Sequence, residues 1–185
     1  MNLVDRVKNI LLNPKEEWPK IAEEPATVGS LYTGYIMILA AIGPIAMIIR
    51  SFALGTPIAI LTYAIGLGLT YVMALIVDAL ATSFGGEKNF LQSLKLITYS
   101  YTVAWLAGIF QILGTIGGVI GLLAGIYAFY TFYLGAPVLK KCSADKAVAY
   151  TIVVILCAVV LTIVLFGVLA SMLFGGAMMG MGAFR

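Results

Sequence analysis

The chain has 185 residues, of which 62% are hydrophobic and 10% are charged, and its net charge is +3. A water-soluble domain is nearer half apolar and a quarter charged, so much of this chain requires a bilayer as its solvent. The basic residues are scattered and form no dense stripe, which excludes a nucleic-acid-binding surface. Histidine is absent, which removes the commonest general base and metal ligand.

The first 28 residues are predicted to form a cytoplasmic or interfacial amphipathic segment. One face of a helix over residues 1–12 carries four apolar residues, Leu3, Val7, Ile10 and Leu11. Asn13 and Pro14 are typical of the start of a second short helix. Trp18 in that helix is predicted to anchor the segment at the membrane interface. The alternative is a cap that packs on the helix bundle.

Five transmembrane helices are predicted to form an all-α integral membrane bundle. Their approximate bounds are 29–49, 57–84, 90–113, 119–139 and 147–174. Pro44 is expected to kink the first of them. Residues 96–139 are about twice the ~20 residues that one crossing needs, so a break is placed at Gly114 to Gly118. The tail, Gly175 to Arg185, is rich in Gly and Met and is expected to be disordered.

The distribution of lysine and arginine predicts a cytoplasmic N-terminus. With that orientation only Arg50 and Arg185 lie outside, and an odd number of spans places the C-terminus outside as well. The other nine basic residues lie on the cytoplasmic side: Arg6, Lys8, Lys15, Lys20, Lys88, Lys95, Lys140, Lys141 and Lys146. The two cysteines, Cys142 and Cys157, are expected to be unpaired thiols.

Asp78 is the one acidic residue inside a predicted span, and an ionisable side chain in hydrocarbon is a candidate functional group. Three hydroxyl-bearing residues lie near it in the sequence: Tyr71, Thr82 and Ser83. These residues are a candidate intramembrane polar site on an ion or solute pathway. However, Asp78 is about two helical turns from Gly85, or ~10 Å. It is therefore also placed to reach the interface and pair with Lys88 or Lys95.

Five glycines have overlapping spacings of the kind that lets helix backbones approach closely: Gly114, Gly117, Gly118, Gly121 and Gly125. They are predicted to pack helices within the bundle or across a homodimer, with a flexible hinge as the alternative. Aromatic residues of the third and fourth spans, such as Tyr99 and Tyr127, are expected to hydrogen-bond between helices or, alternatively, to line a cavity. No nucleotide-binding loop, paired carboxylates or Ser/Cys/His arrangement is present, so no catalytic residue, metal or cofactor is predicted.

Several short patterns follow one another along the chain in an order that is typical of one family. They are Pro14-x-x-x-Trp18, Gly85-Gly86 followed by Phe90, the run from Leu94 to Tyr101 (LKLITYSY), Tyr133-Leu134-Gly135 before a Lys-rich loop, and Lys146-Ala147. Over about residues 5–170 the chain resembles the Yip family (Ypt-interacting proteins), especially its prokaryotic branch. The resemblance implies five spans, a cytoplasmic N-terminus and a prokaryotic inner membrane. Eukaryotic members bind Rab-type GTPases and act in vesicle traffic and membrane shaping.

The leading functional hypothesis is a non-enzymatic membrane protein that binds protein partners or lipids and organises the bilayer. Its expected partners are the lipid bilayer, a protein at the cytoplasmic face and a second copy of the chain, but not nucleic acid. The alternative is a small ion or solute transporter or channel with Asp78 in its pathway. A polar cavity at Asp78 favours this alternative, whereas an Asp78 that faces loops and headgroups favours the leading hypothesis.

Overall fold

A computed structural model describes the backbone of residues 2–182, and the side chains of these residues except 52–55, 166 and 168–182. Every regular element in the described part of the chain is a helix, and no strand occurs there. The chain divides into two compact units, residues 1–151 and residues 152–185. The prediction of an all-α protein is confirmed.

Two short helices form the N-terminal segment. Helix α1 (Leu3–Leu12) begins where the Asn2 side chain accepts a hydrogen bond from the backbone N–H of Asp5 at 2.8 Å. Helix α2 (Pro14–Glu23) begins at Pro14, which suits the first helical position. Asn13 is the residue that precedes this helix, as the sequence pattern indicates, but its side chain makes no capping hydrogen bond.

The first predicted span consists of four consecutive helical pieces. These are α3 (Val28–Leu31), the π-helix η1 (Tyr32–Ile36), α4 (Met37–Ala40) and α5 (Ile42–Arg50). A capping box between Thr27 and Ser30 fixes the start of α3. The interruption between α4 and α5 falls at Ala41. Pro44 has no N–H to donate to the carbonyl of Ala40, which explains why the predicted kink lies there.

The remaining helices complete the described chain. They are α6 (Phe52–Ala81), the 3₁₀ turn η2 (Thr82–Phe84), α7 (Phe90–Ser100), α8 (Thr102–Ala107), the 3₁₀ segment η3 (Gly108–Leu113), α9 (Thr115–Lys140) and α10 (Ala144–Gly182). Five stretches are long and apolar enough to cross a membrane: Val28–Arg50, Thr56–Phe84, Phe90–Leu113, Thr115–Lys140 and Ala144–Leu165. The predicted number of spans is therefore confirmed, and the chain is a multi-pass membrane protein.

Two element boundaries differ from the sequence prediction. The break between the third and fourth spans is Gly114 alone, whose φ of 63° lies in the left-handed region that favours glycine, and α9 begins at the next residue. Helix α10 continues to Gly182, whereas the sequence predicts an end at Phe174. Alanine and methionine, which are frequent in this stretch, have high helix propensity, and this offsets the low helix propensity of the glycines there. Residues 183–185 lie outside the described chain.

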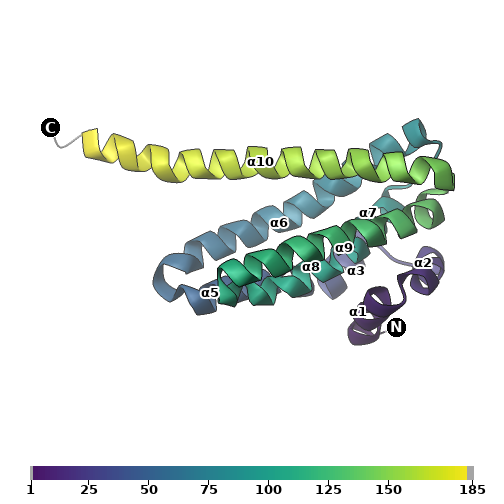
Figure 1. The fold of residues 1–185 in the computed structure, drawn as a ribbon, viewed down its shortest axis with the longest axis horizontal. Helices are drawn as coiled ribbons and strands as arrows, with labels where there is room; N and C mark the ends of the chain where they lie inside the picture. The colour runs from purple at the N-terminus through teal and green to yellow at the C-terminus, as the bar shows by residue number, and fades with distance from the viewer. Residues whose placement is uncertain (1, 183–185) are drawn as a thin grey trace. The chain divides into compact units, whose positions relative to one another are not determined.

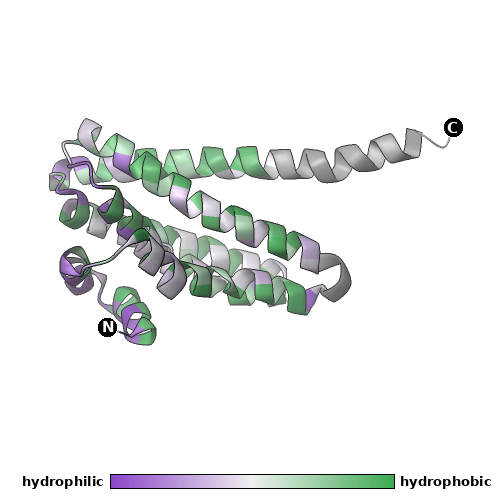
Figure 2. Cartoon of the chain, turned by 180° about the vertical axis from the view of Figure 1, so that it is seen from behind, coloured by the Kyte–Doolittle hydropathy of each residue, from purple (hydrophilic) through white to green (hydrophobic). Residues whose placement is uncertain are grey.

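In the first unit, α7 is the central helix, because every side chain from Ser93 to Ser100 is buried. It packs on α6 and α9 (Figure 1), while α5 packs on η3. At that contact Gly43 meets Gly108 so closely that a Cβ on Gly108 would lie 2.9 Å from the Gly43 Cα. Hydrophilic residues gather at the end of this unit that carries α1 and α2 (Figure 2).

Candidate functional site

Asp78 lies near the end of α6 in a cluster of polar groups drawn from three helices. Its Oδ1 accepts hydrogen bonds from Lys140 Nζ at 2.8 Å, from the Asn89 backbone N–H at 2.7 Å and from Ser93 Oγ at 3.0 Å. The Lys140 side chain is 0% exposed and that of Asp78 is 20% exposed. We call these four residues the Asp78 cluster. It pairs a buried ammonium with a carboxylate, as buried charges require.

The turn after α6 holds Lys140 in this position. The backbone N–H of Glu87 donates to the Lys140 carbonyl at 2.8 Å. A Cβ on Gly86 would lie 2.7 Å from that same carbonyl oxygen, so this close approach requires glycine. Gly85 turns the chain with a φ of 72°, and Lys141 ends α9 with a φ of 54°.

The neighbours predicted for Asp78 are not brought together with it. Tyr71 packs at a tilted angle against Phe90, with 5.0 Å between ring centroids. Thr82 and Ser83 are exposed. The carboxylate pairs neither with Lys88, which is exposed, nor with Lys95, which faces the N-terminal segment. The sequence does not predict Lys140 as the partner of Asp78. Lys140 lies at the boundary between an apolar run and a Lys-rich loop, where a difference of one residue in the helix end decides whether the side chain is buried or exposed.

The ammonium of Lys140 is fully engaged by protein acceptors. Its Nζ donates to Asp78 Oδ1, to Ser93 Oγ at 2.7 Å and to the Asn89 carbonyl at 3.1 Å. An ammonium has three N–H donors, so these three bonds use them all. The Asp78 cluster is thus a closed ion pair that ties α6, α7 and α9 together.

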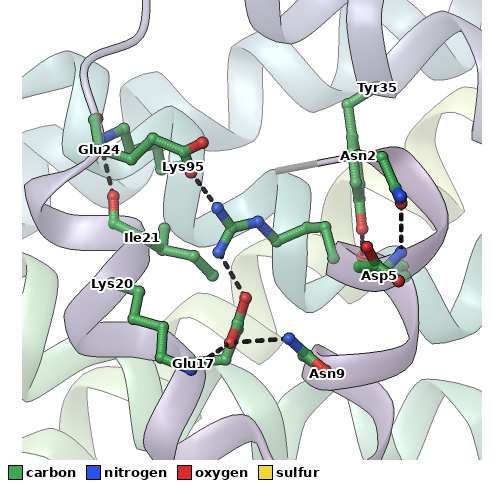
Figure 3. A network of polar contacts seen from close by, with 11 residues as sticks. Asn2, Asp5, Asn9, Glu17, Lys20, Ile21, Glu24, Tyr35 and Lys95 are labelled. Atoms are coloured by element: carbon green, nitrogen blue, oxygen red, sulfur yellow. Dashed lines mark hydrogen bonds and ion pairs between the residues drawn. The ribbon is translucent and has the colours of Figure 1, made fainter.

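A second group of charges joins the N-terminal segment to the bundle, and Figure 3 shows how its members converge. Arg6 on α1 donates to Glu17 Oε1 at 2.6 Å and also pairs with the Glu24 carboxylate. The opposite oxygen of Glu17 accepts from Asn9 and from Lys20, each at 3.3 Å. Arg6 and Glu17 are buried, so the two N-terminal helices are linked by an ion pair in which both charges have partners.

Lys95 on α7 completes this group, which we call the junction cluster: Arg6, Glu17, Glu24 and Lys95. The Lys95 side chain is buried, and its Nζ donates to the carbonyl oxygens of Ile21 at 2.8 Å and Glu24 at 2.6 Å. These carbonyls belong to the C-terminal end of α2, where a cation is favourable. Lys95 therefore fastens α2 to the central helix of the bundle.

Trp18 is buried in the bundle and does not lie on the lipid surface. Its exposed fraction is 0%, and a Cβ on Gly135 of α9 would lie 2.6 Å from its indole ring. The predicted interface anchor is therefore corrected to the alternative, a cap packed on the transmembrane helices. Tyr127 supports the same docking from α9, since its hydroxyl donates to the Leu11 carbonyl at 2.7 Å.

A cavity of about 260 Å³ lies beside the junction cluster, between the N-terminal segment, the first span and α7. Two cations, Arg6 and Lys95, and the Glu24 residue contribute to its wall. Tyr35 and Tyr99 also line it, with 4.8 Å between their ring centroids. The Tyr35 hydroxyl and Thr102 Oγ1 are 2.8 Å apart in a hydrogen bond. Tyr99 thus lines a cavity, whereas Tyr127 bonds between helices.

The Yip1 domain, as described by its family model, matches residues 8–167, which is most of the chain. The chain belongs to the Yip1 domain family. No curated protein and no solved structure matches it. The predicted Yip resemblance is confirmed at the level of the family. The matched residues include the whole Asp78 cluster and all of the junction cluster except Arg6.

In this Yip1-family chain, the five glycines predicted to pack helices have different surroundings. A Cβ on Gly117 would lie 1.9 Å from the Phe110 carbonyl oxygen, so Gly117 permits α9 to pack against η3. Gly114 is the turn residue described above. Gly118, Gly121 and Gly125 have open space where a Cβ would be. The close approaches at Gly43, Gly108 and Gly135 had no repeated spacing that marks them in the sequence.

The described residues of this Yip1-family chain contain no group of three or more His, Cys, Asp or Glu placed to hold a metal ion. Cys142 and Cys157 are free thiols, as expected. Cys142 is buried beside the end of α9, and burial raises the pKa of its thiol. The polar groups that stand out are therefore the Asp78 cluster and the junction cluster with its cavity.

Proposed function

We propose that this Yip1-family chain is a non-enzymatic protein of a prokaryotic inner membrane that binds lipids or protein partners and organises the bilayer around it. The N-terminus lies in the cytoplasm and the C-terminus outside. The observation that carries the proposal is the docking of the N-terminal segment, in which buried Lys95 and Trp18 hold α2 against the bundle. The segment is thereby a fixed surface instead of a free tail.

The outer side of α1 suits contact with lipid or with a partner. Val4 is 70% exposed and Leu12 is 66% exposed, although both are apolar. An amphipathic helix with outward apolar side chains is typical of a segment that lies at a membrane interface. The alternative function, a transporter or channel with Asp78 in its pathway, has less support, because the Lys140 ammonium and neighbouring protein donors already occupy the Asp78 Oδ1.

Reconstitution into sealed liposomes tests the proposal. Wild-type protein is compared with a Val4→Ser/Leu12→Ser variant, by vesicle diameter, by a lipid-packing dye and by crosslinking in cells from a Leu12→Cys variant. We expect wild-type protein to change vesicle shape or lipid packing, and the serine variant to do so less. Wild-type vesicles identical to empty ones, with no crosslinked partner, would contradict the proposal. Ion or solute flux that is lost in Asp78→Asn would instead favour the transporter.

A further inference from the structure

The junction cavity is built by segments far apart in the sequence. Its wall draws on Arg6 of α1, on Glu24 after α2, on Gly34 and Tyr35 of η1, and on Lys95 of α7. Both signs of charge are therefore present around a space of about 260 Å³. We propose that this cavity binds the zwitterionic headgroup of an aminophospholipid. The phosphate lies at Lys95 and Arg6, and the amine lies at Glu24. The inference rests on the proposed function, because it names the class of lipid bound.

The two cations in the wall have donors to offer a phosphate. Lys95 is 3% exposed, and two of its three N–H groups go to the neutral carbonyls of Ile21 and Glu24. Arg6 is 5% exposed, and its planar fork has five N–H groups, of which Nη1 bonds to Glu17 and Nη2 to Glu24. A phosphate oxygen at the cavity would supply a charged acceptor, which makes shorter and stronger hydrogen bonds than a neutral carbonyl.

Glu24 gives the cavity its preference for an amine. Its side chain is 38% exposed, although it pairs with Arg6. A carboxylate offers about four lone-pair sites, so several donors, a primary ammonium among them, can share it. A wall with two cations and one partly exposed carboxylate complements a phosphate that carries an amine better than it complements a phosphate alone.

The cavity adjoins a span with exposed apolar side chains. Gly34 lines it, and a Cβ on Gly34 meets nothing within 4 Å. Further along the same span, Met37 is 40% exposed and Ile38 is 50% exposed. The cavity itself lies near the beginning of the first candidate span, which starts at Val28. A headgroup in the cavity therefore leaves its acyl chains against apolar side chains, which a soluble phosphate would not use.

The π-helix in the wall is an independent indication of a binding role. Tyr32–Ile36 forms this turn and carries both Gly34 and Tyr35. π-turns inside α-helices are rare, and they occur frequently at functional sites. Here the turn holds the buried Tyr35 ring in an edge-to-face contact with Tyr99 and contributes Gly34 to the cavity wall.

Lipid-dependent thermal stabilisation of the full-length protein in detergent tests the inference. The titrants are phosphatidylethanolamine, phosphatidylglycerol, phosphatidylcholine, diacylglycerol and soluble glycerophosphoethanolamine. We expect phosphatidylethanolamine to bind most tightly. Gly34→Leu fills the cavity without removing a charge, and should weaken that binding about tenfold or more. Gly118→Leu is the matched control, because its position is equally open but lies on α9, and it should bind as wild type.

A second variant separates the amine from the phosphate. Glu24→Gln keeps the backbone carbonyl that Lys95 uses, and should abolish the preference for phosphatidylethanolamine over phosphatidylglycerol. The inference is overturned by equal binding of all the phospholipids, by unchanged binding in Gly34→Leu, or by soluble glycerophosphoethanolamine that binds as well as the lipid. Lipid-independent stability together with altered vesicles would refute this headgroup site alone and leave the proposed function standing.

Discussion

At the level of single residues, Lys140 is the buried charge with the clearest energetic role. Its ammonium lies between Asp78 and Ser93 at hydrogen-bonding distance. We expect Lys140→Met to lower the free energy of unfolding by about 3 kcal/mol, because Asp78 loses its cation in a poorly hydrated site. Asp78→Asn should also destabilise. The double variant should recover part of the summed loss, since neither charge is then left alone. Denaturant unfolding in detergent micelles measures these differences.

Lys141 provides the matched control one residue away. Its ion pair with Glu87 has an N–O distance of 2.8 Å, but both side chains are more than half exposed. Such a surface pair contributes about 0.5 kcal/mol, so Lys141→Met should change the free energy of unfolding little. Equal losses from Lys140→Met and Lys141→Met, or additive losses in the double variant, would show that the buried pair is not coupled.

The burial of Cys142 predicts how fast its thiol reacts and how that rate depends on pH. Burial raises the pKa of its thiol, and the thiolate is the form that reacts with maleimides. At neutral pH we therefore expect Cys142 to label several-fold more slowly than an exposed cysteine, and its labelling to keep rising at a pH where the exposed thiol has levelled off. The comparison is Lys141→Cys in a chain with Cys142→Ser, and both chains carry Cys157→Ser. Matching rates and pH profiles would contradict the burial of this thiol.

At the level of helices, two neighbouring glycines of α9 differ in their surroundings: Gly117 lies in a helix contact and Gly118 does not. A Cβ at 117 would collide with the Phe110 carbonyl oxygen, whereas a Cβ at 118 meets nothing. We expect Gly117→Ala to destabilise the protein by about 2 kcal/mol, because α9 must move away from η3. Gly118→Ala should be neutral or stabilise it by up to about 1 kcal/mol, because alanine favours the helix. Thermal unfolding in detergent gives both values, and equal effects would contradict the packing.

The same pair shows what the sequence can and cannot predict about these helices. The number of spans follows from hydropathy, because the length needed to cross a bilayer is a property of each segment alone. The side of α9 that packs on η3 depends on the tertiary arrangement, so the spacing of glycines identified Gly117 but also three positions that face open space. Asp78 was recognised as unusual by its place in an apolar run. Its partner Lys140 was not, because only the folded turn at Gly86 brings the end of α9 to it.

At the level of the whole molecule, the basic residues define two ends of the first unit. Helices α1 and α2, which carry Arg6 and three lysines, lie at the end of this unit where hydrophilic residues gather (Figure 2). Lys95 is bonded to the end of α2, and the 85–89 loop is bonded to the end of α9. Arg50 lies at the other end, where its Nη1 donates to the Gln111 carbonyl at 3.4 Å. A positive bias on one side of the spans is the pattern that places that side in the cytoplasm.

Cysteine accessibility in oriented vesicles tests this orientation. In a chain with Cys142→Ser and Cys157→Ser, Lys88→Cys should label with a membrane-impermeant maleimide only in inverted vesicles. Ser51→Cys should label only in right-side-out vesicles, because it follows Arg50 at the opposite end of the spans. Both side chains are exposed, so detergent-solubilised protein should label at each position and serves as the control. Labelling of Lys88→Cys from the outside would reverse the orientation, and would place the junction cavity and its lipid in the outer leaflet.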